Sequence, residues 1–333
     1  MKALVYLGPR RMELQDLPVP DPGPAEARVR VATAAICGSD LHGFREASPR
    51  RIPPLVMGHE VVGRVEAVGA GVDEALEGER VVVMPVVSCG QCARCREGQA
   101  NLCPRRRLMG MNFPGGFAET YTIGAGQLLP MPPGLSDETG SLVEPFANSL
   151  HSVDRSVREG DDVLVIGAGP IGLLAVRASV LAGAARTFVV DKLEDRLQLG
   201  KEQGGVPLPA EGAADAVEGA TGGDGVDVVI DAVGVPSTWE LGLGSVRWGG
   251  RLDVIGLGSV EGPISYHAVV SKGVTIVGSY ACVRHDFDRA LELLSDGSAD
   301  VGSWITQMPL AEGQAAFEAL VDGGRFTKVV LVP

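Results

Sequence analysis

Four cysteines in one polar loop form the most specific chemical pattern in the sequence. Their spacing is C-x2-C-x2-C-x7-C, given by Cys89, Cys92, Cys95 and Cys103 in a lobe covering about residues 88–104. Four thiolates on a short segment can close a tetrahedron around zinc and leave no open position, as in a structural site. An iron–sulfur cluster also uses four cysteines, but the last gap fits neither common ferredoxin spacing. Unligated thiols would be an oxidation hazard, so we favour structural zinc.

A second group of metal-binding residue types is dispersed over a turn-rich stretch. Cys37, Asp40 and His42 lie in Cys-Gly-Ser-Asp-Leu-His, and His59 and Glu60 lie in Gly-His-Glu. Spacing alone does not bring them together, because 22 residues separate Cys37 from His59, and a lone histidine is more often a core or surface residue. One thiol, one imidazole and several carboxylates are nevertheless suitable ligands for a catalytic zinc, which keeps a fourth position for water or substrate.

A glycine-rich motif of the G-x-G-x-x-G type follows an apolar run. It reads Gly167, Ala168, Gly169, Pro170, Ile171 and Gly172, and it opens a stretch with helical apolar spacing. In such a motif the first glycine makes the turn, the second lets the backbone approach a pyrophosphate, and the third packs helix against strand. The free N–H groups at the helix start would bind the phosphates. The alternative is an ordinary glycine turn.

An acidic residue ends the next apolar run. Asp191 lies 19 residues after Gly172, where a carboxylate would accept hydrogen bonds from an adenosine ribose and repel a 2′-phosphate. We therefore expect NAD rather than NADP as the cofactor. Arg196, in the helical stretch that follows, is included in the expected cofactor site.

Two different patterns divide the chain into regions. The first third contains short strand-like segments at 3–6, 27–32, 61–72 and 80–87. Later apolar runs suit strands buried on both faces of a parallel sheet, at 163–166, 187–190, 226–230, 252–255 and 274–276. Helical stretches at 170–182 and 194–203 separate the earlier runs, so we expect βαβ units and an α/β, doubly wound sheet.

Three further helices and a strand are expected outside these runs. One helix is expected over 138–157, two over 287–294 and 312–321, and a closing strand over 328–332. Composition does not decide whether this C-terminal piece extends the parallel sheet or returns to the first region.

Composition limits the partners and the compartment. The 333 residues carry a net charge of -13, which disfavours nucleic acid and anionic membranes because both need a basic face. No apolar run is long enough for a transmembrane helix, and the start of the chain is unlike a signal peptide. Six cysteines without a secretion signal indicate the reducing cytoplasm.

These motifs, in this order, resemble the zinc-containing medium-chain alcohol and polyol dehydrogenases over nearly the whole chain. Glu144-Pro145 is similar to the branch of sorbitol, threonine and galactitol-phosphate dehydrogenases. The resemblance implies a discontinuous GroES-like catalytic domain, 1–148 and 283–333, around a Rossmann NAD-binding domain, 149–282. It also implies two zinc ions per chain and a homotetramer or homodimer formed partly by edge pairing of Rossmann sheets.

The resemblance also implies roles for individual residues. Cys37, His59 and a glutamate, either Glu60 or Glu144, would hold the catalytic zinc, and Asp40 would fix the His59 tautomer. Zinc would lower the pKa of a substrate hydroxyl, and the proton would leave through a relay of Ser39, the cofactor ribose and His42.

The expected reaction is hydride transfer from a secondary alcohol or polyol to NAD. An amino-alcohol dehydrogenase acting on something like threonine is an alternative, and so is a non-catalytic NAD-binding sensor, which would lack a ligand or relay residue. A zinc-independent quinone reductase is disfavoured because the zinc motifs are present. Candidate substrate-pocket residues lie near the metal motifs: Leu41, Phe44, Met111, Asn112 and Phe113. Arg45, Arg50 and Arg51 could bind a phosphorylated polyol, but surface arginines are the favoured interpretation.

Overall fold

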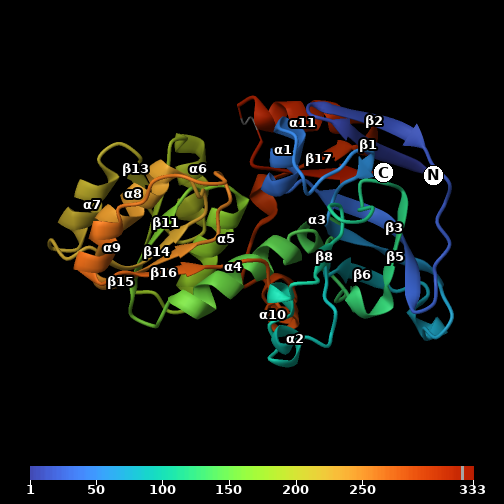
Figure 1. Ribbon diagram of the computed structural model, residues 1–333, viewed down its shortest axis with the longest axis horizontal. Coiled ribbons are helices and arrows are strands. Elements are labelled where there is room, and N and C mark those ends of the chain that lie inside the picture. Colours follow the sequence, from blue (N-terminus) through green and yellow to red (C-terminus); the bar gives the residue numbers. More distant parts are fainter. Residues whose placement is uncertain (324–325) are drawn as a thin grey trace. The chain divides into compact units, whose positions relative to one another are not determined.

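The computed structural model describes residues 1–323 and 326–333, and the chain forms two compact units. The first unit comprises Met1–Glu144 and Val283–Pro333, and the second comprises Pro145–Cys282. Figure 1 shows the elements of both. The junction expected after residue 148 lies inside helix α4 (Val143–Ser156), a few residues past the boundary of the units. None of the described helices is both long and apolar enough to cross a membrane.

The first unit is built mainly from β-strands. Its largest sheet has the order β10-β6-β5-β3-β18-β17, and β9 also pairs with β3. A second sheet has the order β2-β1-β4, and β7 pairs with β8. The strands are β1 (Lys2–Gly8), β2 (Arg11–Asp16), β3 (Glu26–Ala35), β4 (Leu55–Val56), β5 (Glu60–Val68), β6 (Arg80–Val83), β7 (Val86–Val87), β8 (Arg107–Leu108), β9 (Thr120–Gly124), β10 (Leu128–Pro130), β17 (Ile305–Pro309) and β18 (Lys328–Val332).

The C-terminal segment returns to this first unit. Strand β18 pairs antiparallel with β3, with Val330 opposite Ala35, and β17 runs parallel to β18. In Figure 1 the red C-terminal strands accordingly lie within the blue N-terminal unit. The helices of the unit are short: α1 (Gly38–Arg45), α2 (Ala93–Arg96), α3 (Asp137–Gly140), α10 (Arg284–Ser295), α11 (Gly313–Val321) and the 3-10 turns η1 (Glu74–Leu76), η2 (Ala100–Leu102), η3 (Ala125–Gln127), η4 (Gly302–Trp304) and η5 (Leu310–Glu312).

The prediction of one continuous helix over residues 138–157 is wrong. The structure has α3, which ends at Gly140, and a separate α4 that begins at Val143. Pro145 explains the break, because proline has no N–H to donate and is tolerated only in the first turn of a helix. It occupies the first turn of α4, so the helix cannot extend back through it.

The second unit contains the expected parallel sheet. Its strand order is β13-β12-β11-β14-β15-β16, and every neighbouring pair is parallel. This is the doubly wound order 3-2-1-4-5-6, so the α/β fold with a Rossmann sheet is confirmed. The elements are β11 (Asp162–Ile166), α5 (Pro170–Leu181), β12 (Arg186–Asp191), α6 (Glu194–Glu202), β13 (Val206–Pro209), α7 (Ala213–Ala220), β14 (Val226–Asp231), α8 (Pro236–Ser245), β15 (Val246–Val254), α9 (Tyr266–Lys272) and β16 (Thr275–Gly278).

Strand β13 escaped prediction for a physical reason. It contains Pro207 and Pro209, which argue against a central strand. The structure places β13 at the end of the sheet, where a missing N–H is tolerated.

Candidate functional site

Strand pairing brings the dispersed metal-binding residues together. Strands β3 and β5 are antiparallel, and Ala35 at the end of β3 lies opposite Glu60 at the start of β5. Cys37 and His59 flank this pair, which is how residues far apart in sequence become neighbours. One ligand atom each from Cys37, His59 and Glu60 lies within 4.8 Å of the other two.

Gly58 lets the chain turn into this arrangement. Its φ is +94°, a backbone conformation that other residues rarely adopt. A Cβ added there would lie 2.7 Å from the ring of Phe117. The glycine of Gly-His-Glu is therefore needed to present His59, which is 3% exposed.

Helix α1 carries the remaining residues of the predicted site. The ring of Phe44, on its last turn, packs on Phe317 of α11 with ring centroids 5.1 Å apart. Phe44 is fully buried in this contact, so its expected place in the substrate pocket is wrong. This packing anchors the helix that presents Ser39, Asp40 and His42.

Asp40 connects the elements around His59. Its Oδ2 accepts a hydrogen bond from the backbone N–H of Cys37 at 3.2 Å, and its Oδ1 accepts one from Arg51 Nη2 at 3.1 Å. The Nδ1 atom of His59 lies 3.6 Å from the same Oδ1, which is close but longer than a hydrogen bond. Asp40 is completely buried.

Glu60 is paired with a lysine from the other end of the chain. Lys328 Nζ donates to Glu60 Oε2 and also, at 3.0 Å, to the carbonyl oxygen of Ile36. Within residues 1–323 and 326–333, Glu60 Oε1 has no hydrogen-bond partner. Buried polar atoms are normally satisfied, so an orphaned carboxylate oxygen beside a thiol and an imidazole fits a bound metal ion. The S, N and O ligand types suit zinc.

The electrostatic field of the site favours a positive charge. Burial lowers the pKa of His59, but Asp40, Cys37 and Glu144 outweigh that effect and raise the pKa to about 10. Glu144 is buried at the start of α4 and contributes to this field, although the described three-residue ligand set includes Glu60 rather than Glu144. A site that attracts a proton so strongly in the absence of metal is suited to a divalent cation.

The four cysteines form a second candidate metal site. One sulfur atom from each of the four lies within 4.8 Å of the others, around the short helix α2. The Sγ atoms of Cys92 and Cys95 are 3.5 Å apart, and none of the four is in a disulfide. A hydrogen bond from the backbone of Gln91, helped by neighbouring cysteines, lowers the pKa of Cys89 to about 6. Thiolate is the form that binds zinc, so the residues present fit a closed tetrahedral site.

His42 lies on the exposed side of α1. Ser39 and His42 are three residues apart in the helix, so they share one face. Partial burial, followed by the positive charge of Arg45, lowers the pKa of His42. A neutral imidazole near neutral pH can accept a proton.

The glycine-rich loop connects β11 to α5 in the second unit. Gly167 has φ +94°, and a Cβ on Gly172 would lie 1.7 Å from the carbonyl oxygen of Gly167, so both positions require glycine. A Cβ on Gly169 would meet no atom within 4 Å, which means that open space faces this residue at the start of α5. Pro170 and Ile171 begin the helix. The loop therefore offers a cradle that fits a dinucleotide pyrophosphate.

Asp191 is held at the edge of this loop. Its Oδ2 accepts a hydrogen bond from the N–H of Ala168 at 2.7 Å, and its Oδ1 accepts one from Leu193 at 3.0 Å. Arg196 is partly buried in α6. The carboxylate thus occupies the end of the second strand, and each of its oxygens retains a lone pair for a ribose hydroxyl.

Sequence reasoning missed three residues that support these sites. Arg51, interpreted as a surface arginine, is 4% exposed and contacts Asp40. Lys328 was assigned only to a strand. Asp231, at the end of β14, accepts hydrogen bonds from the N–H groups of Val233 and Gly234 and from Thr238 Oγ1. Each is a single charged residue outside any recognisable motif, so no sequence signal distinguished it.

Two protein-family models match successive parts of the chain. Residues 23–133 match the alcohol dehydrogenase GroES-like domain, and residues 170–296 match the zinc-binding dehydrogenase family. Sorbitol dehydrogenase of Bacillus subtilis (strain 168) is 32% identical, with 100% of this chain and 97% of the relative covered. L-threonine 3-dehydrogenase of the same organism is 34% identical, covering 100% of this chain and 99% of the relative.

Solved structures of similar proteins cover the whole chain as well. Alcohol dehydrogenase TADH from Thermus sp. ATN1 superimposes with a TM-score of 0.92 at 33% identity, covering 100% of this chain and 99% of that one. Coverage is the same for a zinc-binding dehydrogenase from Sinorhizobium meliloti 1021 bound to NADP (TM-score 0.91, 30% identity) and an alcohol dehydrogenase from E. coli CFT073 complexed with NADH (TM-score 0.93, 29% identity). The two family models and the full-length relatives at 32% and 34% identity show that the chain belongs to the zinc-containing medium-chain alcohol and polyol dehydrogenase family.

Proposed function

We propose that this chain passes a hydride from a secondary alcohol or polyol to NAD, with a catalytic zinc held by Cys37, His59 and Glu60. Membership of the family makes it an oxidoreductase acting on CH–OH groups. The proposal rests mainly on one observation: the ligand atoms of a thiol, an imidazole and a carboxylate all lie within 4.8 Å of one another. No catalytic residue expected from the sequence is missing, which argues against a non-catalytic sensor.

The chain's own residues supply binding, orientation and proton transfer. A zinc ion held by these residues would lower the pKa of a substrate hydroxyl, and bound NAD would supply the hydride acceptor. Ser39 receives the hydroxyl proton on its Oγ while passing its own proton into the relay that ends at His42, and His42 releases a proton to solvent. Asp40 orients the His59 ring. The hydroxyl of Ser39 is therefore regenerated in each turnover.

Glu60 is the proposed carboxylate ligand, and Glu144 the proposed neighbour that adds negative charge. This choice is supported by the three-residue ligand set and by the Glu60 Oε1 atom left without a hydrogen-bond partner among the described residues. Substituting each in turn separates the two roles. We expect Glu60→Gln to release the catalytic zinc on dialysis, whereas Glu144→Gln should retain it; the opposite pattern would assign the ligand to Glu144.

The proposed cofactor complement is NAD and two zinc ions per chain. Asp191 supports NAD, because its carboxylate would repel the 2′-phosphate of NADP. The four-cysteine lobe supports a second, structural zinc in addition to the catalytic one. Elemental analysis of purified protein should give close to two zinc ions per chain, and Cys37→Ser should remove one of them.

The test of the reaction is NADH formation across polyols, polyol phosphates, threonine and simple primary and secondary alcohols. We expect a chelator-sensitive signal with a polyol or secondary alcohol, and no turnover by Cys37→Ser although NAD still binds. A preference for threonine would favour the amino-alcohol alternative, which the identity to L-threonine 3-dehydrogenase keeps open. Turnover by Cys37→Ser would contradict the catalytic-zinc assignment.

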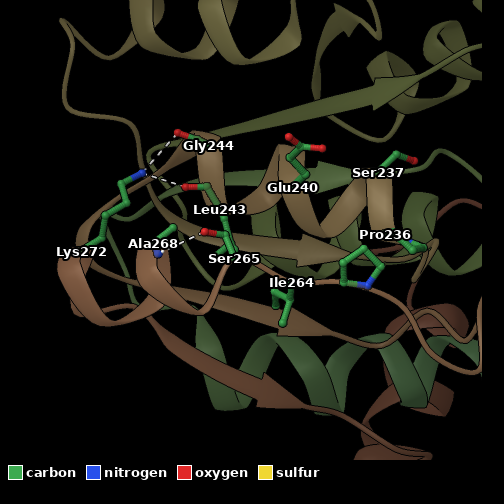
Figure 2. Close-up of a pocket in the computed structure, with 10 residues that line it drawn as sticks. Pro236, Ser237, Glu240, Leu243, Gly244, Ile264, Ser265, Ala268 and Lys272 are labelled. Carbon is green, nitrogen blue, oxygen red and sulfur yellow. Dashed lines mark hydrogen bonds between the residues drawn. The ribbon is translucent and has the colours of Figure 1, made fainter.

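We also propose that the chain forms a homodimer or homotetramer through its parallel sheet. Strand β16 ends the sheet order, and Ile276 on it is 42% exposed. The same unit has a pocket of about 720 Å³ beside α8 (Figure 2), where Lys272 donates to the carbonyl oxygens of Leu243 and Gly244. Light scattering should give a dimer or larger, and Ile276→Lys should reduce the mass; an unchanged mass would exclude this edge.

The proposed compartment is the cytoplasm. Support comes from the four clustered free cysteines, which a reducing compartment keeps available for zinc. Cell fractionation with an antibody against the chain would test it, and recovery in an extracellular or membrane fraction would contradict it.

A further inference from the structure

Arg51 is buried beside the proposed relay, unlike the arginines near it in sequence. It lies between α1 and β4 and is 4% exposed, whereas Arg45 and Arg50 are exposed. Its side chain crosses α1 at Gly43, where a Cβ would lie 2.5 Å from Arg51 Cδ. A residue without a side chain at position 43 is therefore what gives the arginine its path to the site.

One nitrogen of Arg51 contacts two residues of the site at once. Nη2 donates to Ser39 Oγ and to Asp40 Oδ1, both at 3.1 Å. The Nε–H is buried without a hydrogen-bond partner among the described residues. An interaction serving only to neutralise Asp40 would not require contact with the Ser39 hydroxyl.

The chemistry of the guanidinium fixes the direction of the bond to Ser39. Arginine can only donate hydrogen bonds and stays charged at all accessible pH values, so Ser39 Oγ must be the acceptor. A hydroxyl has two lone pairs and one hydrogen. With one lone pair bound by Arg51, the other can receive the substrate proton, and the hydrogen must point away from Arg51.

We propose that Arg51 is a positioning residue for proton transfer through Ser39, an inference that rests on the function proposed above. The guanidinium holds the Ser39 hydroxyl in one orientation and braces Asp40 behind His59. If the Ser39 proton leaves before the substrate proton arrives, the charge of Arg51 stabilises the negative Oγ in this partly buried setting. One proton enters Ser39 and one leaves it, so Ser39 and Arg51 end the cycle unchanged.

Arg51→Met tests the proposal because it keeps the length and apolar packing of the side chain but removes the charge and donors. We expect kcat for alcohol oxidation to fall about 10–100-fold, with little change in the KM for NAD. The solvent deuterium isotope effect on kcat should rise, because proton transfer becomes rate-limiting. Arg51→Lys should restore part of the rate. The neighbouring exposed Arg50→Met is the matched control and should behave as wild type.

A double-mutant cycle separates positioning from a general structural role. In a Ser39→Ala background, Arg51→Met should cost far less than in wild type, because the group that it positions is gone. An equal loss in both backgrounds, or an unchanged isotope effect in the single variant, would overturn the proposal. If Arg51→Met does not fold, the same cycle with Arg51→Lys decides the question.

A readout that needs no substrate separates this inference from the proposed function. Cobalt(II) replaces zinc, and the relevant absorption is the part of the d–d spectrum that Cys37→Ser abolishes. Because Arg51 braces Asp40 behind His59, we expect Arg51→Met to shift these bands and Arg50→Met to leave them unchanged. If Arg51→Met shifts the cobalt bands but the wild-type protein turns over no alcohol, only the proposed function is contradicted, and the role of Arg51 stands. An unshifted spectrum would contradict the bracing by Arg51 even in a protein that turns over alcohols.

Discussion

Lys328, in the last strand, forms a buried ion pair with Glu60, which lies 268 residues earlier in the chain. Their side chains are 2% and 1% exposed. Burial raises the pKa of Glu60, and the charge of Lys328 acts in the opposite direction. The pair therefore ties the C-terminal strand to the proposed metal ligand and occupies Oε2, whereas Oε1 has no hydrogen-bond partner among the described residues.

Removing Lys328 should destabilise the protein strongly. Lys328→Met removes the hydrogen-bonded partner of the buried Glu60 carboxylate, and breaking a buried pair in this way costs about 3–5 kcal/mol of unfolding free energy. Urea denaturation of the metal-free protein measures the loss. The double variant Lys328→Met, Glu60→Gln should recover part of it, because no charge is then stranded. An equal loss in both variants would mean that lost packing, and not charge, is responsible.

The pH dependence of alcohol oxidation should report His42. Partial burial, then Arg45 and Arg51, lower its pKa below the usual 6.5, while Glu46 acts in the opposite direction. The lowered pKa means that the neutral, proton-accepting form persists to lower pH. The rise of kcat/KM with pH should therefore have its midpoint below 6.5, and activity should be lost as the pH falls through it.

Two variants identify the group behind that ionisation. His42→Gln should slow turnover and abolish the rise of kcat/KM with pH. Arg45→Gln should move this rise to higher pH, because a positive charge beside the imidazole is removed. A rise that persists in His42→Gln would assign the ionisation to another group.

Much of the fold and most of the proposed site residues could be predicted from sequence because local patterns encode them. Gly167, Gly169 and Gly172 are required by backbone geometry, and the cysteine lobe is contiguous. The proximity of Cys37 to His59 depends on the β3–β5 register, which no local pattern specifies. The family resemblance supplied it instead.

The sequence could not predict the long-range contacts that single residues make in the folded chain. Arg51 and Lys328 carry charges that are usually solvated, and only the folded chain shows them buried against Asp40 and Glu60. Phe44 was misplaced for the same reason, because an aromatic residue next to a metal motif can face either the substrate or the core. Here it packs on Phe317.

Cofactor preference should depend on Asp191. Asp191→Ala removes a charged hydrogen-bond acceptor, which is worth about 1.5–3 kcal/mol, so NAD affinity should fall about 10–100-fold. Discrimination against NADP should relax as well. Fluorescence titration with NADH and NADPH measures both effects. Asp195→Ala, an exposed carboxylate in the next helix, is the control and should bind as wild type.

The side chain of Asp191 also stabilises the glycine loop, so the cofactor result needs a second variant. Asp191→Asn keeps one oxygen to accept from the N–H of Ala168 but has no negative charge. It should bind NADPH better than wild type while remaining folded. If Asp191→Asn and the wild-type protein discriminate equally between NADH and NADPH, charge repulsion at Asp191 does not determine the cofactor preference.

Loss of one cysteine of the lobe should affect folding more than chemistry. Cys95→Ser removes one of four thiolates, and the loop of about residues 88–104 has little apolar core of its own, so zinc supplies much of its order. We expect one zinc fewer per chain, a lower thermal midpoint and rapid proteolysis within the lobe. Protein that remains folded should retain NADH binding, because that site lies in the other unit. A stable variant with the full zinc content would contradict a structural metal site at these four cysteines.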